Sequence, residues 1–558
     1  MLSGNEALVR GLTAARMKRA WSFPGSPLTR LEMLLDAHKP PSTVTHRYAV
    51  NEHVAMSLAL GGALLSGNNT CALMKHVGVN VALDTLATFG VVNELRSACL
   101  LLEGVDPAPK TSQNAQDNRS TLADVAHLAQ LEAAAPDELY HLTRVAVGAS
   151  LRTNMPMLLR TGTRGLELKA PVNELPPDLP DTSAAFSRSG GPYICTAGSY
   201  RFHVEKRARR LAQLQPLVDA LCVQSGAIGE GKHAVIVAGH LGARAQARAW
   251  ARRLPTLRLG ASWPLPRARL IEFLRGRDNV LVLEEGAPFL EHAIQALAHR
   301  EGLSCRVRGA GGARPLSLDD DRLELTLGRF GGRVRAEADV MPRDAVSWRA
   351  IYDAAAGIGV DDGEPWPLFV ARTRAQMKGF AAADPRLTLL RALRGLERPT
   401  MLVADPGNTG VLGIRERLID VKMHMGSAAP IAGALSEALE MEERSGAGAP
   451  LSVALIGDTN HYHSELLGVL DNAIARREVL HVLVVNRRSE MTGGVKTPYL
   501  ADDALEAQLR SAGLQVATAQ LEDPGLGSAV AYAASRSGPR ALVCYSAQDA
   551  KSDPDSDG

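Results

Sequence analysis

The feature that most constrains the fold is residues 451–498, where two short apolar runs flank one amphipathic segment. Val453-Ala454-Leu455-Ile456 stops at Gly457-Asp458-Thr459, and a second apolar run, 480–485, ends at Asn486. Between them, residues 465–475 place leucines and one isoleucine on a single helical face. Two buried-strand patterns around one helix predict a βαβ unit, with a right-handed crossover and parallel strands.

Asp458 and Asn486 are therefore expected at the carboxyl ends of their strands, the edge where open α/β sheets bind ligands. A carboxylate and an amide oxygen are donors that Mg²⁺ accepts together with water and phosphate. The spacing alone leaves a plainer alternative equally open, in which Gly457-Asp458 only ends a strand and caps a helix.

Neighbouring residues make the pattern more specific. His463-Ser464 follows Asp458, and Met491-Thr492-Gly493-Gly494 follows Asn486. Together these motifs resemble the diphosphate-binding domain of indolepyruvate ferredoxin oxidoreductase large subunits, in the 2-oxoacid:ferredoxin oxidoreductase family. The resemblance implies thiamine diphosphate and Mg²⁺ as cofactors.

The N-terminal part carries a second set of motifs. Asn5-Glu6-Ala7, Pro24-Gly25-Ser26-Pro27, Asn51-Glu52-His53-Val54-Ala55 and the segment 74–80 occur in the order of the pyrimidine-binding domain of that family. Taken alone, Glu52 is a carboxylate at a helix N-terminus, which the helix dipole favours. The resemblance instead implies that Glu52 bonds the aminopyrimidine of the cofactor and promotes formation of its nucleophilic ylid.

The resemblance also implies roles for the remaining candidates. Asp458, Asn486 and a main-chain oxygen near Arg488 are expected to bind Mg²⁺. A helix N-terminus containing glycine and serine lets backbone amides approach an anion. The expected cofactor-binding residues are Ser26, Gly426, Ser427, Gly457, Thr459, Met491 and Thr492, and the expected proton donors or substrate binders are His76, His461 and His463. For Ser26 and His76, a satisfied polar group in a turn remains an equal alternative.

Strands alternating with helices predict an α/β protein of three doubly wound parallel-sheet domains. By resemblance these are a pyrimidine-binding domain at 1–185, a transketolase C-terminal-like domain at 190–340 and a diphosphate-binding domain at 385–546. A helical linker is expected at 341–384 and a disordered tail at 547–558. Residues 305–345 are rich in glycine and arginine and are expected to be irregular. Glu284-Glu285 is interpreted as structural or interfacial.

Composition limits the partners. The formal net charge is +2 and no apolar stretch reaches 18 residues, so we expect no nucleic-acid or membrane partner and a cytoplasmic protein. The six cysteines are widely spaced, with no two closer than Cys195 and Cys222. Iron–sulfur and zinc sites need close-set cysteines, so neither is expected, and these thiols are interpreted as buried small hydrophobes.

Two departures from the family leave the reaction open. The family's Cys-Pro-Gly-Cys-Pro segment is here Asp405-Pro406-Gly407-Asn408-Thr409, and its C-terminal cysteine-rich domain does not follow. Asn460-His461 and Glu490 also add polar groups beside the cofactor motif.

Three hypotheses follow from these departures. The first is a 2-oxo acid decarboxylase or carboligase that ends non-oxidatively. The second is the catalytic subunit of an oxidoreductase whose smaller partner subunit handles electrons and coenzyme A. The third is a non-catalytic structural subunit. An arylpyruvate such as indolepyruvate as substrate and a homodimer are expected from the resemblance.

Overall fold

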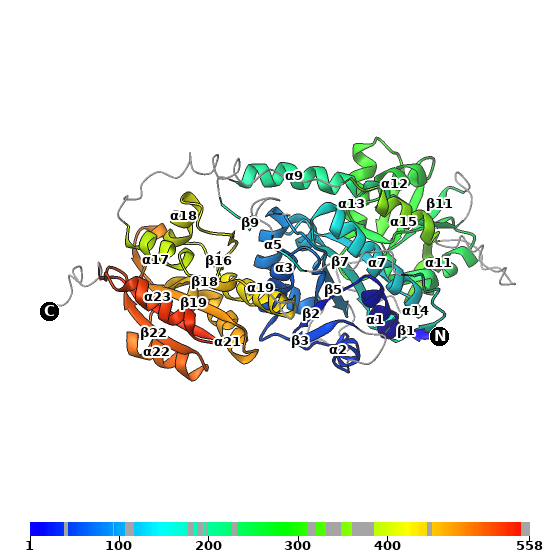
Figure 1. Ribbon diagram of the computed structural model, residues 1–558. Helices are drawn as coiled ribbons and strands as arrows, with labels where there is room; N and C mark the ends of the chain where they lie inside the picture. The colour runs from blue at the N-terminus through cyan, green and yellow to red at the C-terminus, as the bar shows by residue number, and fades with distance from the viewer. Residues whose placement is uncertain are drawn as a thin grey trace.

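The computed structural model describes residues 1–37, 43–92, 94–106, 116–176, 184–186, 193–196, 199–225, 231–309, 320–330, 347–359, 384–442 and 449–547. Within these ranges the chain forms three α/β units, each built on a mainly parallel sheet, which confirms the predicted fold class (Figure 1). None of the helices described there is long and apolar enough to cross a membrane. The predicted tail, from residue 548 onward, and residues 360–383 of the predicted linker lie outside the described residues.

The first unit contains a sheet in the order β13-β6-β7-β5-β4-β2-β3, in which β13 pairs antiparallel to β6 and the other neighbours are parallel. Its strands are β2 (Arg19–Ser22), β3 (Thr45–Tyr48), β4 (Thr70–Lys75), β5 (Cys99–Val105), β6 (Ala129–Ala133), β7 (Met157–Gly162) and β13 (Ala261–Trp263). Its helices are α1 (Gly4–Ala14), α2 (Thr29–Asp36), α3 (Glu52–Gly62), α4 (His76–Val79), α5 (Leu83–Val92), α6 (Arg119–Asp124), α7 (Pro136–Thr153) and α8 (Thr163–Glu167). A small ladder of β1 (Leu2–Ser3) and β8 (Lys169–Ala170) closes its edge.

The middle unit has the order β10-β12-β11-β14-β15, formed by β10 (Val223–Ser225), β11 (His233–Val237), β12 (Thr256–Arg258), β14 (Asn279–Leu283) and β15 (Arg306–Gly309). The helices of this stretch of the chain are α9 (Tyr200–Gln213), α10 (Gln215–Ala220), η1 (Gly239–Leu241), α11 (Gly242–Ala251), α12 (Arg267–Leu274), α13 (Phe289–Arg300), α14 (Asp320–Phe330) and α15 (Trp348–Ala356). Of these, α10 and α15 bury their apolar side chains in the core of the first unit. Glu284 caps α13 by accepting the amides of Leu290 and Glu291, both at 2.9 Å, and pairs with Arg119 of the first unit at 2.9 Å.

The third unit has the order β22-β23-β19-β18-β16-β17-β9, with every neighbouring pair parallel. Its strands are β9 (Tyr193–Ile194), β16 (Thr400–Ala404), β17 (Val421–Lys422), β18 (Leu451–Gly457), β19 (Val479–Val485), β22 (Gln515–Gln520) and β23 (Arg540–Tyr545). Its helices are α17 (Pro385–Arg394), α18 (Asn408–Arg415), α19 (Ala428–Glu442), α20 (Asp458–Asn460), α21 (Leu466–Ile474), α22 (Asp502–Ser511) and α23 (Leu526–Ser535). A short hairpin of β20 (Arg488–Ser489) and β21 (Val495–Lys496), with η4 (Glu490–Thr492) between its strands, extends from β19.

The predicted βαβ unit is confirmed, because β18 and β19 are parallel neighbours with Gly457 opposite Val484. The connecting helix begins earlier than predicted: α20 continues through a π-helical turn, His461–Glu465, into α21. Just beyond α21, buried Arg477 pairs with Asp471 at 2.5 Å and with Glu437 of α19 at 3.0 Å. These ion pairs hold the crossover helix against α19.

Two strands join sheets outside their own stretch of sequence. β9 precedes the middle unit but pairs with β17 of the third, and β13 lies within the middle stretch but pairs with β6 of the first. Neither exchange was predicted, since short apolar runs carry no information about which sheet they enter. The domain bounds therefore stay predictions.

The interpretation of residues 305–345 as irregular was wrong where the structure describes them. β15 extends the middle sheet, and α14 buries Leu323, Leu327 and Phe330 against it. These three side chains follow helical spacing, and the surrounding glycines and arginines obscured that pattern.

The first and third units pack together through α3 and α19, which lie side by side in Figure 1. Their buried apolar side chains, among them Met56, Leu60, Ile431 and Leu435, belong to one continuous core. An ideal Cβ on Gly61 of α3 would lie 2.9 Å from the Ile431 backbone, so the two helix axes approach closely.

Candidate active site

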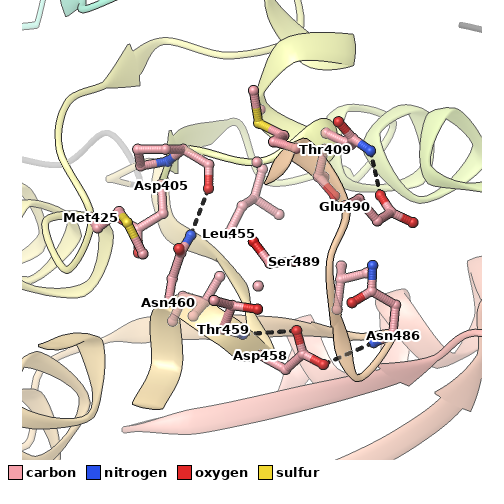
Figure 2. Close-up of a pocket in the computed structure, with 18 of the residues that line it drawn as sticks. Asp405, Thr409, Met425, Leu455, Asp458, Thr459, Asn460, Asn486, Ser489 and Glu490 are labelled. Atoms are coloured by element: carbon pink, nitrogen blue, oxygen red, sulfur yellow. Dashed lines mark hydrogen bonds between the residues drawn. The ribbon is translucent and has the colours of Figure 1, made fainter. Parts of the chain in front are cut away.

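A cavity of about 400 Å³ opens at the carboxyl edge of the third sheet, where β16, β18 and β19 end. Its lining residues all come from the third unit, within 386–492. Apolar side chains of Leu455, Ile456, Val484 and Met425 form part of the wall, and polar groups from the strand ends face them (Figure 2).

Asp458 and Asn486 lie on one side of this cavity, with the Asp458 carboxylate turned toward Asn486 in Figure 2. Asp458 is buried, and its Oδ1 accepts the amide of Thr459 at 2.8 Å. Its Oδ2 accepts the amides of Asn486 at 3.1 Å and Arg487 at 2.5 Å. The carboxylate therefore ties the end of β18 to the loop that follows β19.

The donor chemistry of this corner suits a hard divalent cation. Asp458 brings a carboxylate and Asn486 an amide oxygen to the same corner of the cavity, and both are hard oxygen donors. The Asn486 side-chain oxygen accepts the Arg488 amide at 3.2 Å, and Arg488 also lines the cavity. The described residues contain no group of three His, Cys, Asp or Glu side chains that could hold a metal ion. A cation here would thus depend on one carboxylate, one amide oxygen and ligand oxygens, the pattern that suits Mg²⁺.

The predicted cofactor-binding residues divide into two groups. Gly457, Thr459, Met491 and Thr492 line the cavity, as does the Arg488 predicted to lie beside the metal. Gly426 and Ser427 do not line it; they form the turn before α19.

The amides of that turn already have an acceptor. The buried Asp405 carboxylate accepts Gly426 at 3.2 Å and both Ser427 and Ala428 at 3.1 Å. Asp405 itself lines the cavity. A diphosphate at these amides would have to displace Asp405, and the predicted contact with Gly426 and Ser427 stays untested.

Asp405 forms a buried carboxyl pair with Glu465. Burial raises the pKa of both groups, and the Asp405 charge raises that of Glu465 further. Glu465 Oε1 accepts the Ala429 amide, so the pair occupies the first amides of α19 between them. Three amides favour the ionised form of Asp405 and oppose the rise in its pKa, so protonation of the pair is favoured at Glu465. An aspartate directly after the buried run of β16 was the only sequence feature that pointed to this pair.

A second group of polar side chains lies at the outer rim of the cavity. Glu490 Oε2 accepts from Arg386 at 2.6 Å and from the Asn408 side chain. On the other wall the Asn460 amide donates to the Pro406 carbonyl at 2.6 Å, as the dashed line in Figure 2 shows. Through its contacts with Arg386 and Asn408, Glu490 connects the 488–492 loop to α17 and α18.

The three predicted histidines do not line the cavity. His76 is fully buried at the start of α4, and burial together with Arg160 lowers its pKa. His461 is also buried, lies 3.3 Å from Gln508, and has a pKa lowered by burial. His463 is exposed, with its ring 2.8 Å from the Ser464 hydroxyl.

Glu52 and Ser26 belong to the first unit and likewise lie outside the cavity lining. Glu52 is the first residue of α3, where the side chain of Asn51 caps the helix by accepting the Val54 amide at 2.9 Å. Its half-buried carboxylate lies against Gly78. Within one chain, the predicted activating carboxylate is therefore not part of the cavity wall.

A Ser–His–Asp arrangement in the first unit lies apart from this site. His46 lies 2.9 Å from the Ser22 hydroxyl and 2.5 Å from Asp36. Ser22 is completely buried in the strand β2, so its hydroxyl cannot reach a substrate. These contacts stabilise the sheet edge and do not form a hydrolytic site.

Comparison with known proteins supports the resemblance. No protein-family model matches the chain. Indolepyruvate oxidoreductase subunit IorA of Methanothermobacter marburgensis is 26% identical over 90% of this chain and 78% of its own length. IorA of Pyrococcus abyssi is 24% identical over 89% of this chain and 76% of its own length. These matches confirm the predicted resemblance to indolepyruvate oxidoreductase large subunits, and they cover about 90% of the chain.

Solved structures give weaker likenesses. A 2-oxoglutarate:ferredoxin oxidoreductase from Magnetococcus marinus matches with a TM-score of 0.47 and 15% identity, over 59% of this chain and 64% of that chain. A putative thiamin diphosphate-dependent enzyme from Mycobacterium smegmatis matches with a TM-score of 0.49 and 15% identity, over 98% of this chain and 99% of that chain.

Proposed function

We propose that the chain is a thiamine diphosphate- and Mg²⁺-dependent enzyme that decarboxylates a 2-oxo acid, with an arylpyruvate such as indolepyruvate as substrate. The observation that carries this proposal is the shared cavity of Asp458 and Asn486, at the strand ends where the resemblance implies a metal and a diphosphate. Similarity to indolepyruvate oxidoreductase subunits along 90% of the chain supports the substrate class.

Each group of residues in the cavity would have a separate role. Asp458, Asn486 and the main chain at Arg488 would hold Mg²⁺, with Gly457 and Thr459 beside the diphosphate. When bound there, thiamine diphosphate would supply a nucleophile for the substrate carbonyl and an electron sink for the pair released with CO₂. The apolar side of the cavity would keep water from that carbon.

Proton handling distinguishes two ways to finish the reaction. Asp405 lines the cavity next to the buried Glu465, whose pKa is raised by burial and by the Asp405 charge, so this pair is a candidate proton source for the site. This favours a non-oxidative ending, with an aldehyde or a carboligation product. The names of the relatives favour the second candidate, an oxidoreductase whose smaller partner subunit handles electrons and coenzyme A.

The site would be completed by a second copy of the chain. Glu52 does not line the cavity of its own chain. The crossover helix α21 exposes Leu467 and Ile474, with 38% and 74% of their surface open, on a face that another chain would cover. We therefore propose a homodimer in which Glu52 of one copy serves the cavity of the other.

The reaction is tested by incubating the protein with thiamine diphosphate, Mg²⁺ and indolepyruvate or phenylpyruvate, with and without coenzyme A and a viologen dye. Aldehyde and CO₂ without dye reduction would support the non-oxidative ending. Dye reduction that requires coenzyme A would support the oxidoreductase. Wild-type protein that is as inactive as the D458N control with both substrates would contradict the proposal and favour a non-catalytic subunit.

The dimer is tested by mixing two inactive variants, E52Q and D458N, after unfolding and refolding them together. If the site is shared between copies, random pairing restores about a quarter of the wild-type activity, because half of the dimers contain one intact site of two. If each chain builds its own site, the mixture stays inactive.

A further inference from the structure

A buried network of hydrogen-bonded polar side chains connects the first unit to the turn before α19. Thr85, fully buried in the first turn of α5, lies 3.1 Å from His53 Nδ1 and 3.0 Å from His424 Nε2. Its hydroxyl is also 3.1 Å from that of Ser57. On the far side of the His53 ring, Nε2 lies 3.0 Å from the Gly426 carbonyl oxygen.

These contacts fix which atom donates each hydrogen bond among these polar side chains. The Gly426 carbonyl can only accept, so His53 carries its hydrogen on Nε2, and its Nδ1 accepts from the Thr85 hydroxyl. Thr85 has one hydrogen to give, so both Ser57 and His424 must donate to its oxygen. The other nitrogen of His424, Nδ1, has no hydrogen-bond partner among the described residues. In this arrangement both imidazoles are neutral, and a charged His424 would add a buried N–H at Nδ1 that has no acceptor among the described residues.

Protonation of His53 disrupts this order. A second hydrogen would sit on Nδ1, where the Thr85 hydrogen already points, so Thr85 would have to turn its hydrogen toward Ser57 and Ser57 would have to become the acceptor. Burial lowers the pKa of His53 and of His424, His463 lowers both further, and the His53 ring adds to the lowering at His424. The charged and titratable groups around them are Asp84 on α5, which favours a charged His53, and His463 and Lys422 in the third unit, which oppose a charged His424.

We infer that Thr85 is a positioning residue, which through His53 and His424 holds the first turn of α3 against the turn before α19. The first of these turns presents Glu52, and the second contains Met425 of the cavity wall. The relay thus links the turn that carries Glu52 to a wall of the cavity in its own chain, and its hydrogen-bond order is that of two uncharged rings. The link to cofactor chemistry rests on the proposed function, whereas the link between the two turns rests on the contacts alone.

A matched pair of variants tests the relay. T85V keeps the side-chain shape and removes the hydroxyl, and T85S keeps the hydroxyl. Hydrogen–deuterium exchange of the cofactor-free protein, corrected for intrinsic rate, should be faster in T85V around residues 50–58 and 422–428 by about fivefold, as the loss of one neutral hydrogen bond implies. At pH 7.5 only T85V should exchange fast, and its difference from wild type and T85S should narrow as the pH of the assay is lowered toward 5.5.

The activity readout uses the same variants with thiamine diphosphate, Mg²⁺ and phenylpyruvate. Wild type and T85S should keep kcat/KM through the ordinary histidine range and lose it in more acidic solution, whereas T85V should be impaired already at neutral pH with a flattened acid limb. Exchange in T85V equal to that of wild type at both pH values, or T85S behaving as T85V, would overturn the relay. The exchange pattern with no turnover of any substrate would uphold the relay and refute the proposed function.

Discussion

Replacing Gly78 by alanine should move the Glu52 carboxylate without removing it. An ideal Cβ on Gly78 would contact Glu52 Oε1, and would lie 2.6 Å from its Cγ and 2.8 Å from its Cδ. Carbon atoms do not approach this closely, so one partner must shift. Glu52 is the end of a flexible side chain, and we expect it to rotate away from the new methyl group.

The structure indicates a small change in stability and a large change in activity. Alanine is favoured over glycine in a helix by about 0.5–1 kcal/mol, and a displaced Glu52 rotamer costs about as much. The free energy of unfolding should therefore change by less than about 1 kcal/mol. A misplaced proton-transfer group commonly costs 10²-fold or more, so kcat should fall by about 10²-fold, or about 2.7 kcal/mol of activation free energy.

Urea unfolding and turnover of phenylpyruvate measure both effects. G148A is the matched control, because nothing lies within 4 Å of a Cβ at Gly148 of helix α7. It should keep wild-type activity, and E52Q should lose as much activity as G78A. A G78A protein with wild-type kcat beside an inactive E52Q would refute the claim that Gly78 sets the position of Glu52.

Three further perturbations have definite expected outcomes. Burial lowers the pKa of His481 from 6.5 to about 4, so its contribution to stability is complete above pH 6.5 and is lost as pH falls toward 4. Urea unfolding at a series of pH values should show a loss of up to about 3 kcal/mol. An H481Q protein whose stability falls with the same pH slope would contradict this assignment. R477M removes the buried cation between Asp471 and Glu437, although Glu437 keeps Arg47 at 3.0 Å, and should cost about 3 kcal/mol in urea unfolding, against less than about 0.5 kcal/mol for R476M at an exposed neighbour. G61V forces a side chain against the backbone of Ile431 and should lower the melting temperature by the equivalent of about 1–3 kcal/mol; an unchanged melting temperature would mean that the two helices separate freely.

Several features of the site were predictable from the sequence because they follow from local patterns. Continuous apolar runs identified β18 and β19, and the parallel geometry of a βαβ unit placed Asp458 and Asn486 at one edge. The neighbouring Met491 and Thr492 line the same cavity. These positions depend on strand period and on where each run stops, which the sequence shows directly.

Other features depend on contacts between distant segments. The sequence predicted an open anion-binding turn at Gly426-Ser427, but Asp405 occupies its amides, since a strand end and a helix start meet only in the folded sheet. It also could not place the rings of His461 and His463, because a π-helical turn rotates the helix between α20 and α21. Each outcome reflects geometry across segments rather than spacing within one.

By itself, the sequence determined the α/β class, the βαβ unit and the order of polar groups at its strand ends, because backbone periodicity and burial dictate these locally. Only the tertiary structure decided that β9 and β13 enter sheets of other units, that a carboxyl pair caps α19, and that Thr85 joins two histidines from different units. The physical reason is that a buried hydrogen-bonding group takes whichever partner folding brings within about 3 Å, and that choice is made by packing.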